Sequence, residues 1–246
     1  MRSLLLLLPF LALLPTSATA ADKKDASRMS AQESYELGMR YMKRGYTTKA
    51  LEQLNRVRTY FRDDPYALKA EIAIADAHFE RNEFDAARMA YEDFQRAHPR
   101  SADMDRVVYK LGLSQLRKAP TVASRDQTWT VTAVRTLSSF LTRFPNSPLR
   151  PEVEKDLAKA RARLARKELV IGAFYYKKQS WNAAIGRLAP MVAQYPDSPD
   201  RAEALGRLGI AYAMTDRKDE AKATLATLRQ EAPASPWALR LAAVAE

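Results

Sequence analysis

Two residue registers run through this 246-residue sequence at a constant offset of 12 positions. The first register is a small residue that follows a helix-start signal, and the second lies in a helix-breaking segment, usually at a proline. The pairs are Ala50 with Arg62, Ala87 with Pro99, Ala133 with Pro145, Ala184 with Pro196 and Ala221 with Pro233. Because chance does not hold one offset over five copies, we expect the chain to be built from repeated helical units.

A third register lies 12 positions before the small residue in most copies, at Gly38, Ala75, Gly172 and Gly209. An apolar residue precedes each of these positions, and Tyr or His follows three residues later. This pattern is typical of the tetratricopeptide (TPR) repeat, in which helix A and helix B form a hairpin that ends at a proline. Since neither helix buries its apolar stripe alone, we predict an all-α fold, a right-handed α-solenoid of five tetratricopeptide-like helix hairpins.

The unequal spacing of the copies, at 37, 46, 51 and 37 residues, locates two insertions. In the third copy the helix-A glycine is Gly112, and the excess of 9 residues predicts an exposed loop over Lys118–Asp126. In the fourth copy the excess of 14 residues lies in Glu152–Phe174, which contains no proline and no glycine before Gly172. Helix A of that repeat is therefore expected to be longer by about 20 Å, at roughly 1.5 Å per residue. A projecting loop and a projecting helix are the expected places for specific contacts.

The first twenty residues differ in composition from the rest and are typical of a secretory signal peptide. A basic start is followed by an apolar stretch from Leu4 to Leu14 and by a cleavage site at Ala18–Ala20. We predict a signal peptide over 1–20, a flexible arm over 21–29, repeats 1–3 with a substrate groove over 30–148, and repeats 4–5 with a C-terminal cap and a partner-docking region over 149–246. No later stretch is long and apolar enough to predict a transmembrane segment in the mature chain.

The composition argues against a catalyst. The sequence has no cysteine, two histidines and seven glycines, which disfavours thiol chemistry, histidine-based metal sites and glycine-rich phosphate loops. His78 and His98 occupy register positions that Tyr or Phe fills in other copies, so we expect both to be packing aromatics. The prediction is therefore a chain with no enzyme activity, no catalytic residue, no cofactor and no metal.

Several segments outside the repeat consensus carry a more specific signal. They are the Arg125–Thr128 run (Arg-Asp-Gln-Thr), Phe144–Ser147, the part of the long helix at Leu164–Leu169, Tyr175–Lys178, Trp181–Arg187 and Tyr195–Ser198. Together with the loop and the long helix, they resemble the BamD family over Ser30 to Glu231. That family is the tetratricopeptide component of the machinery that inserts β-barrel proteins into bacterial outer membranes.

The resemblance implies a scaffold with two protein-binding regions. The N-terminal repeats would receive C-terminal segments of unfolded outer-membrane proteins, with groove candidates Tyr35, Tyr46, Phe79, Phe84 and Tyr91. The C-terminal repeats would hold the periplasmic domains of an Omp85-type insertase and other subunits of the machinery, and the family's docking arginine on the fourth helix B maps onto Arg187. The partner-binding candidates are Arg187, Glu168, Tyr176, Arg125, Asp126, Gln127, Lys155, Lys159, Arg163 and Arg166.

Part of the basic excess, a net charge of +11, lies on the long helix. Helical spacing places Lys155, Lys159, Arg163 and Arg166 on one face, which would suit an acidic partner domain or an anionic membrane surface. No nucleic-acid partner is expected, because an exported chain without a nucleic-acid motif is a poor candidate for one.

One feature departs from the BamD family. Its members typically carry a lipidated cysteine after the signal peptide, whereas Ala21 follows the cleavage site here, so there is no lipobox cysteine. We therefore predict a periplasmic protein that is peripheral to the outer membrane and held there by partners or by charge. Two other interpretations are left open at this point: a periplasmic TPR adaptor for cell-envelope or division complexes, and a noncatalytic peptidoglycan-associated protein.

Overall fold

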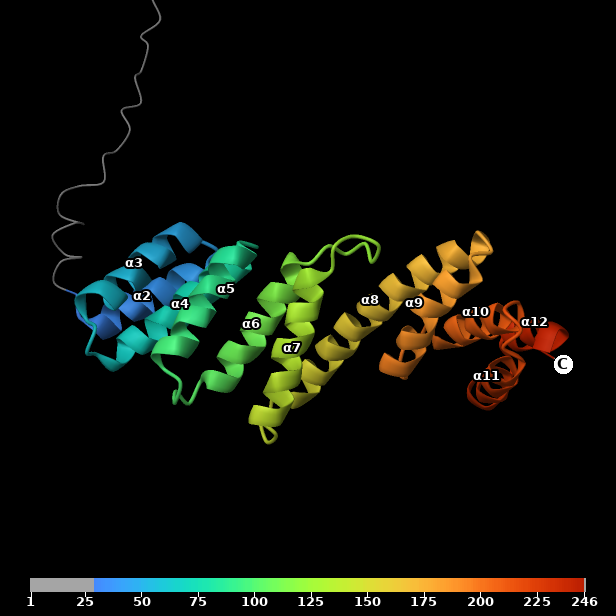
Figure 1. The fold of residues 1–246 in the computed structure, drawn as a ribbon. Coiled ribbons are helices and arrows are strands. Elements are labelled where there is room, and N and C mark those ends of the chain that lie inside the picture. Colours follow the sequence, from blue (N-terminus) through green and yellow to red (C-terminus); the bar gives the residue numbers. More distant parts are fainter. Residues whose placement is uncertain (1–28, 246) are drawn as a thin grey trace, which may run out of the picture. The chain divides into compact units, whose positions relative to one another are not determined.

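A computed structural model describes residues 29–245, and every regular element within that range is an α-helix (Figure 1). The predicted signal peptide and all but the last residue of the predicted arm lie outside the described residues. The helices are α2 (Ala31–Lys43), α3 (Thr47–Tyr60), α4 (Pro65–Glu80), α5 (Phe84–Ala97), α6 (Met104–Lys118), α7 (Thr128–Arg143), α8 (Arg150–Lys177), α9 (Trp181–Gln194), α10 (Arg201–Ala213), α11 (Lys218–Glu231) and α12 (Pro236–Ala245).

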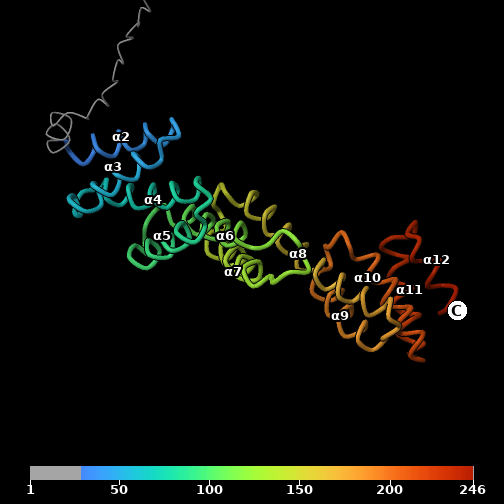
Figure 2. The backbone as a smooth tube through the Cα atoms, turned by 90° about the horizontal axis from the view of Figure 1, so that it is seen from above, coloured from blue at the N-terminus to red at the C-terminus, as the bar shows by residue number. Residues whose placement is uncertain are grey.

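These helices form the five predicted hairpins, α2/α3, α4/α5, α6/α7, α8/α9 and α10/α11, and α12 follows as the cap. The all-α TPR fold is thereby confirmed. The described residues divide into two compact units, one up to Glu71 and the other from Ile72 onward. Within the second unit, Figures 1 and 2 show the helices side by side in chain order, and α5 to α12 each contact their neighbours in sequence.

The small residues of the alanine register (Ala50 and its equivalents) and of the glycine register (Gly38 and its equivalents) lie where helix A meets helix B. Ala50, Ala87, Ala133, Ala184 and Ala221 are all completely buried. A Cβ atom on Gly38 would lie 2.9 Å from Leu54 Cγ, and one on Gly172 would lie 2.6 Å from Leu188 Cγ, so a leucine 16 positions later fills the space beside each glycine. In the third repeat the same leucine is Leu137, nine positions further along, because the loop insertion lies between the two helices. The glycines are therefore required by the close approach of the helices.

A serine follows each inter-repeat proline and lies shortly before the next helix. The Oγ atoms of Ser101, Ser147 and Ser198 each accept a hydrogen bond at 3.2 Å from the backbone N–H two positions later, and Ser235 does so at 3.3 Å. In the first connection Asp64 accepts the bond from the Tyr66 N–H at 2.8 Å. Asp64 and Ser235 thereby satisfy an N–H group in the first turn of α4 and α12, which lacks a partner within the helix. Ser101, Ser147 and Ser198 instead stabilise the turn that leads into α6, α8 and α10.

The predicted length of helix A in the fourth repeat is confirmed, because α8 has 28 residues and α10, the next helix A, has 13. Its second half contributes Ala165 and Leu169 to a hydrophobic core with α9 and α10. Before that point α8 continues past the end of α9 and packs on α7, and it also contacts α6. One helix therefore contacts both the preceding and the following repeat.

Candidate functional site

A groove of about 700 Å³ lies between α6 and α8, and we call it the α6–α8 groove. Its α6 side is mainly apolar, with the half-buried side chains of Tyr109, Leu113 and Leu116. Its α8 side is charged. The remaining lining residues are Asn82, Phe84, Arg117, Ala119, Thr121, Glu152, Lys155, Asp156, Lys159 and Arg163.

The charges of this groove are unevenly paired. Asp156 accepts hydrogen bonds from the Lys159 ammonium at 2.8 Å and from the Tyr109 hydroxyl at 2.9 Å. Burial, with Asp156 adding to it, raises the pKa of the Tyr109 phenol, so the hydroxyl keeps its proton and stays a donor. Arg163 has no such partner: its Nη1 atom is buried and makes no hydrogen bond with any described residue. Four cations face two carboxylates in the groove, and the surplus is positive.

The four cations predicted to form one basic face of α8 have different neighbours in the structure. Lys155, Lys159 and Arg163 line the α6–α8 groove, whereas Arg166 donates at 2.6 Å to Asp200, which precedes α10. Since α8 passes from α6 and α7 to α9 and α10 along its length, residues on one helical face meet different neighbours. Arg166 therefore contributes to the repeat junction.

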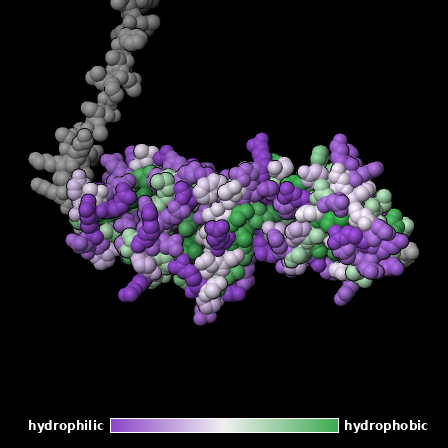
Figure 3. Space-filling model, in the orientation of Figure 1, coloured by the Kyte–Doolittle hydropathy of each residue, from purple (hydrophilic) through white to green (hydrophobic). Residues whose placement is uncertain are grey.

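A second hollow, of about 320 Å³, lies beside the first half of α8, where that helix extends beyond the end of α9. Leu157, Ala158 and Ala162 line it from α8, and Tyr195 closes it from the α9–α10 connection. Arg161 donates to the Gln194 carbonyl oxygen at 2.8 Å and covers the Tyr195 ring at 5.5 Å. Figure 3 shows a hydrophobic band running along the α7–α8 region between hydrophilic side chains. The length difference between α8 and α9 thus leaves apolar surface at the repeat junction.

The candidates of the fourth repeat lie on α8 and α9. Arg187 is exposed and donates to Glu168 at 3.4 Å, a long contact that leaves most of its donors free of protein partners. Tyr176 is half-buried, with the rings of Trp181 and Trp237 at 5.4 and 6.4 Å and the Arg207 guanidinium over its own ring. Tyr176 therefore joins the fourth repeat to the cap, and Arg187 is the accessible member of this group.

The Arg-Asp-Gln-Thr run holds the inserted loop. Gln127 is 1% exposed, and its amide nitrogen donates to the carbonyl oxygens of Pro120 and Val122 at 3.1 and 3.0 Å. Asp126 accepts from the backbone N–H and the hydroxyl of Thr128. These bonds and burial leave Gln127 no surface for a partner, because its side chain is used to close the loop. Arg125 is exposed beside it.

The predicted aromatic groove residues have unequal positions. Tyr91 is completely buried and donates its hydroxyl hydrogen to Asp76 at 2.6 Å, so the prediction that it lines a groove is wrong. Phe79 and Phe84 are half-buried and lie edge to face at 5.5 Å. In the first compact unit, the ring centres of Tyr35 and Tyr66 are 5.4 Å apart. Tyr46 lies edge to face with Tyr41, and 56% of its surface is exposed. Of the five, Phe84 lines the α6–α8 groove.

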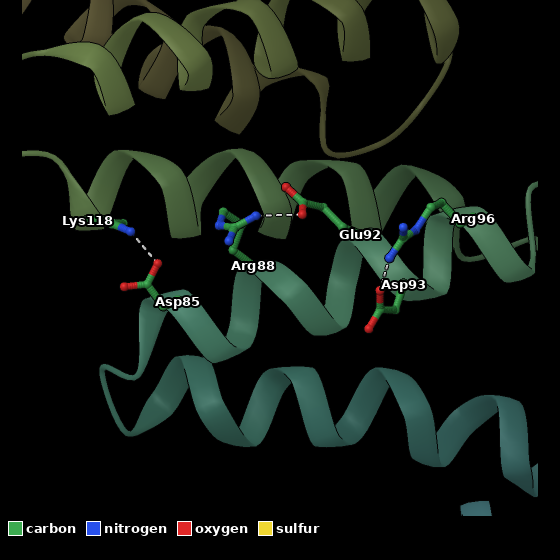
Figure 4. Close-up of polar contacts among 6 residues, drawn as sticks. All are labelled: Asp85, Arg88, Glu92, Asp93, Arg96 and Lys118. Atoms are coloured by element: carbon green, nitrogen blue, oxygen red, sulfur yellow. Dashed lines mark hydrogen bonds and ion pairs between the residues drawn. The ribbon is translucent and has the colours of Figure 1, made fainter.

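A charged cluster at the start of α7 was not predicted. Lys118 pairs with Asp85, and Arg88 pairs with Glu92, while Asp93 and Arg96 form a separate pair on the same helix (Figure 4). Lys118 and Arg88 also lie over the Trp129 ring, at 4.1 and 5.2 Å from its centre. The cluster connects α5, α6 and α7 beside the inserted loop. In the sequence the cluster is marked only by Trp129 at the start of α7. The two cations that lie over its ring come from other helices, so their proximity depends on the fold.

Neither histidine is placed for metal binding. His78 Nδ1 lies 2.7 Å from Glu83, and this hydrogen bond lowers the pKa of the Glu83 carboxyl. His98 lies against Phe94 at 4.9 Å. Among residues 29–245 no group of three or more potential metal ligands comes together, and none of the helices there has the length and apolarity that a membrane span requires.

The chain is similar to known proteins over most of its length. The family model YfiO, described as an outer membrane lipoprotein, matches residues 27–228. The outer membrane protein assembly factor BamD of Pasteurella multocida (strain Pm70) is 27% identical over 229 residues, which cover 89% of this chain and 88% of that protein. BamD of Rickettsia prowazekii (strain Madrid E) is 27% identical over 217 residues, which cover 87% and 86%. Among solved structures, the TPR2AB domain of yeast Sti1 in complex with an Hsp90 peptide has a TM-score of 0.45, with 18% identity over 87% of this chain and 82% of that one.

Proposed function

Because this chain belongs to the YfiO family of outer membrane lipoproteins, matching its model over residues 27–228, we propose that it is a noncatalytic scaffold of outer-membrane protein assembly. Its BamD relatives are named as outer membrane protein assembly factors, and they match it over most of both chains. The observation that carries the proposal is this similarity along most of the chain, which includes the loop and the long helix that a generic repeat lacks. The protein would work in the periplasm, peripheral to the outer membrane.

The fourth and fifth repeats are the proposed docking region for the periplasmic domains of an Omp85-type insertase. Arg187 supports this, because its guanidinium is exposed and the 3.4 Å contact with Glu168 is weak. A carboxylate of a partner would compete with Glu168 for the same fork of donors. The repeats before them would receive unfolded outer-membrane proteins, with the half-buried Phe79 and Phe84 as candidate contacts.

The test is affinity purification of the tagged protein from envelopes in mild detergent. We expect an Omp85-type insertase in the eluate, and we expect Arg187→Glu to reduce its yield about fivefold through charge repulsion at the rim of the interface. Arg135→Glu is the matched control, because Arg135 is exposed on α7 in the preceding repeat.

Two results would contradict this function. The first is an eluate without any insertase but with division or peptidoglycan proteins, which would favour the adaptor interpretation. The second is an equal loss of insertase in the Arg187→Glu and Arg135→Glu variants, which would place the contact elsewhere.

A further inference from the structure

We propose that the α6–α8 groove binds an extended acidic segment of a partner protein, with the Arg163 guanidinium holding one of its carboxylates. Arg163 lines the groove, and its Nη1 atom is buried with no acceptor among the described residues. The rest of the Arg163 side chain is half-buried and faces the groove, so a carboxylate brought by a ligand would give this unpaired guanidinium charge-assisted hydrogen bonds. Lys159 is already paired with Asp156, so of the three α8 cations that line the groove, Arg163 and Lys155 lack an ion pair within residues 29–245.

The spacing of these two cations defines the ligand further. Lys155 and Arg163 are eight residues apart on α8, which is about 12 Å along the helix. An extended chain places residues i and i+4 on one side at about 13 Å, so two acidic side chains at this spacing meet both cations. The side chains at i+1 and i+3 point the other way, toward Leu113, Leu116 and Tyr109 on α6. The ligand is therefore a segment in which acidic and apolar residues alternate.

The same geometry disfavours a membrane surface as the occupant. A plane of lipid headgroups reaches cations on a convex surface, whereas Arg163 lies inside a concave groove. The half-buried leucines opposite also suit apolar side chains better than headgroups. A single C-terminal carboxylate would satisfy only one of two cations that are about 12 Å apart.

The experiment measures fluorescence anisotropy of a labelled peptide with the purified protein, produced from the full sequence. The peptide is acetylated and amidated, alternates glutamate with leucine or phenylalanine, and is compared with its glutamine counterpart. We expect the glutamate peptide to bind at least about tenfold more tightly, with affinity falling as salt rises. Arg163→Gln should weaken binding about tenfold, whereas Arg166→Gln, on the same helix but paired with Asp200, should leave it unchanged.

A second measurement covers the case in which Arg163→Gln fails to fold. In this measurement the peptide carries a photo-reactive phenylalanine analogue at an apolar position. On irradiation with the unaltered protein, the peptide should become crosslinked to residues 109–117. Equal binding of both peptides, equal effects of the two arginine variants, or crosslinks elsewhere would overturn the proposal. So would binding that requires a free C-terminal carboxylate, or competition by anionic vesicles. This site is independent of the Arg187 surface, so loss of one interaction leaves the other testable.

Discussion

At the scale of single residues, two glycines of α10 show how closely the cap is packed. A Cβ atom on Gly206 would lie 2.4 Å from Trp237 Cβ, and one on Gly209 would lie 2.4 Å from Leu241 Cδ2. The first overlap is with an atom attached to the α12 backbone, so it is relieved only if the helix moves. The second is with the end of a flexible side chain. Gly206 is therefore the residue that sets the distance between α10 and α12.

We expect Gly206→Ala to lower the free energy of unfolding by about 1–3 kcal/mol, since the overlap outweighs the gain in helix propensity. Gly186 on α9 is the control, because nothing lies within 4 Å of a Cβ atom built there. Gly186→Ala should raise the free energy of unfolding by up to about 1 kcal/mol. Urea denaturation followed by circular dichroism measures both, and an increase for Gly206→Ala would contradict the packing.

Which residues are buried was predictable from the registers, but which partners they meet was not. The five register alanines are buried because periodicity alone places them between the paired helices. Tyr91 was expected at a surface, yet its hydroxyl reaches Asp76 on the preceding helix. Arg166 has the helical spacing of Arg163, but its partner Asp200 is 34 residues away. Such contacts depend on the packing angles between helices, and a local sequence pattern does not predict these angles.

At the scale of helices, Arg201 at the start of α10 connects that helix to α9 and α11. Its guanidinium donates to both carboxylate oxygens of Glu231 at the end of α11, at 2.7 and 3.0 Å, and also to the Val192 carbonyl oxygen of α9. The hydrogen bond from Arg201 holds the pKa of the Glu231 carboxyl below its usual value of 4.5. The ionised Glu231 carboxylate is therefore expected to stabilise the folded protein.

This pair predicts a pH-dependent contribution to stability. A lowered pKa in the folded state means that the contribution is present above pH 4.5 and is lost as the pH falls through the folded pKa. Since the Glu231 side chain is 38% exposed, we expect Glu231→Gln to cost about 0.2–1 kcal/mol at pH 7 and less at pH 3. Urea denaturation at the two pH values measures this difference, and an equal cost at both would mean that the carboxylate charge is not responsible.

The inserted loop is a second element whose length was predictable but whose structure was not. The repeat arithmetic located nine extra residues, and α6 and α7 indeed end and begin around residues 119–127. The buried amide of Gln127 carries the two bonds that close this loop. A glutamine in a polar run gave no signal of burial, because its acceptors are backbone carbonyls of the loop itself.

We expect Gln127→Ala to open the loop. Two bonds to backbone carbonyls are lost, at about 1–3 kcal/mol. Amide hydrogen exchange should accelerate roughly tenfold or more within residues 119–126, while the α9–α11 amides keep their rates. Thr132→Ala is a suitable control on α7, because the Thr132 hydroxyl bonds only to the Thr128 carbonyl of its own helix. Equal exchange profiles for the two variants would show that Gln127 does not hold the loop.

At the scale of the whole molecule, α8 determines which repeats communicate. It contacts α6 and α7 on one side and α9 and α10 on the other, whereas α11 contacts α10 and α12. The length of α8 followed from the sequence, but the groove beside it did not, because the groove depends on how α8 crosses α7 and reaches α6. In an array of this kind each repeat depends mainly on its neighbours, so damage at one end is expected to stay there.

The C-terminal cap tests this locality. Leu241 is completely buried in the core shared by α10, α11 and α12, so Leu241→Ala should cost about 2–5 kcal/mol. Because α12 packs mainly on α10 and α11, the loss should raise amide exchange strongly in α10–α12, less in α9, and least in α6 and α7. Leu137→Ala, in the buried core between α6 and α7 of the third repeat, should move the maximum to α6 and α7. A uniform rise across α6–α12 in either variant would mean that residues 72–245 unfold as one cooperative unit, and binding at the α6–α8 groove would then be sensitive to the cap.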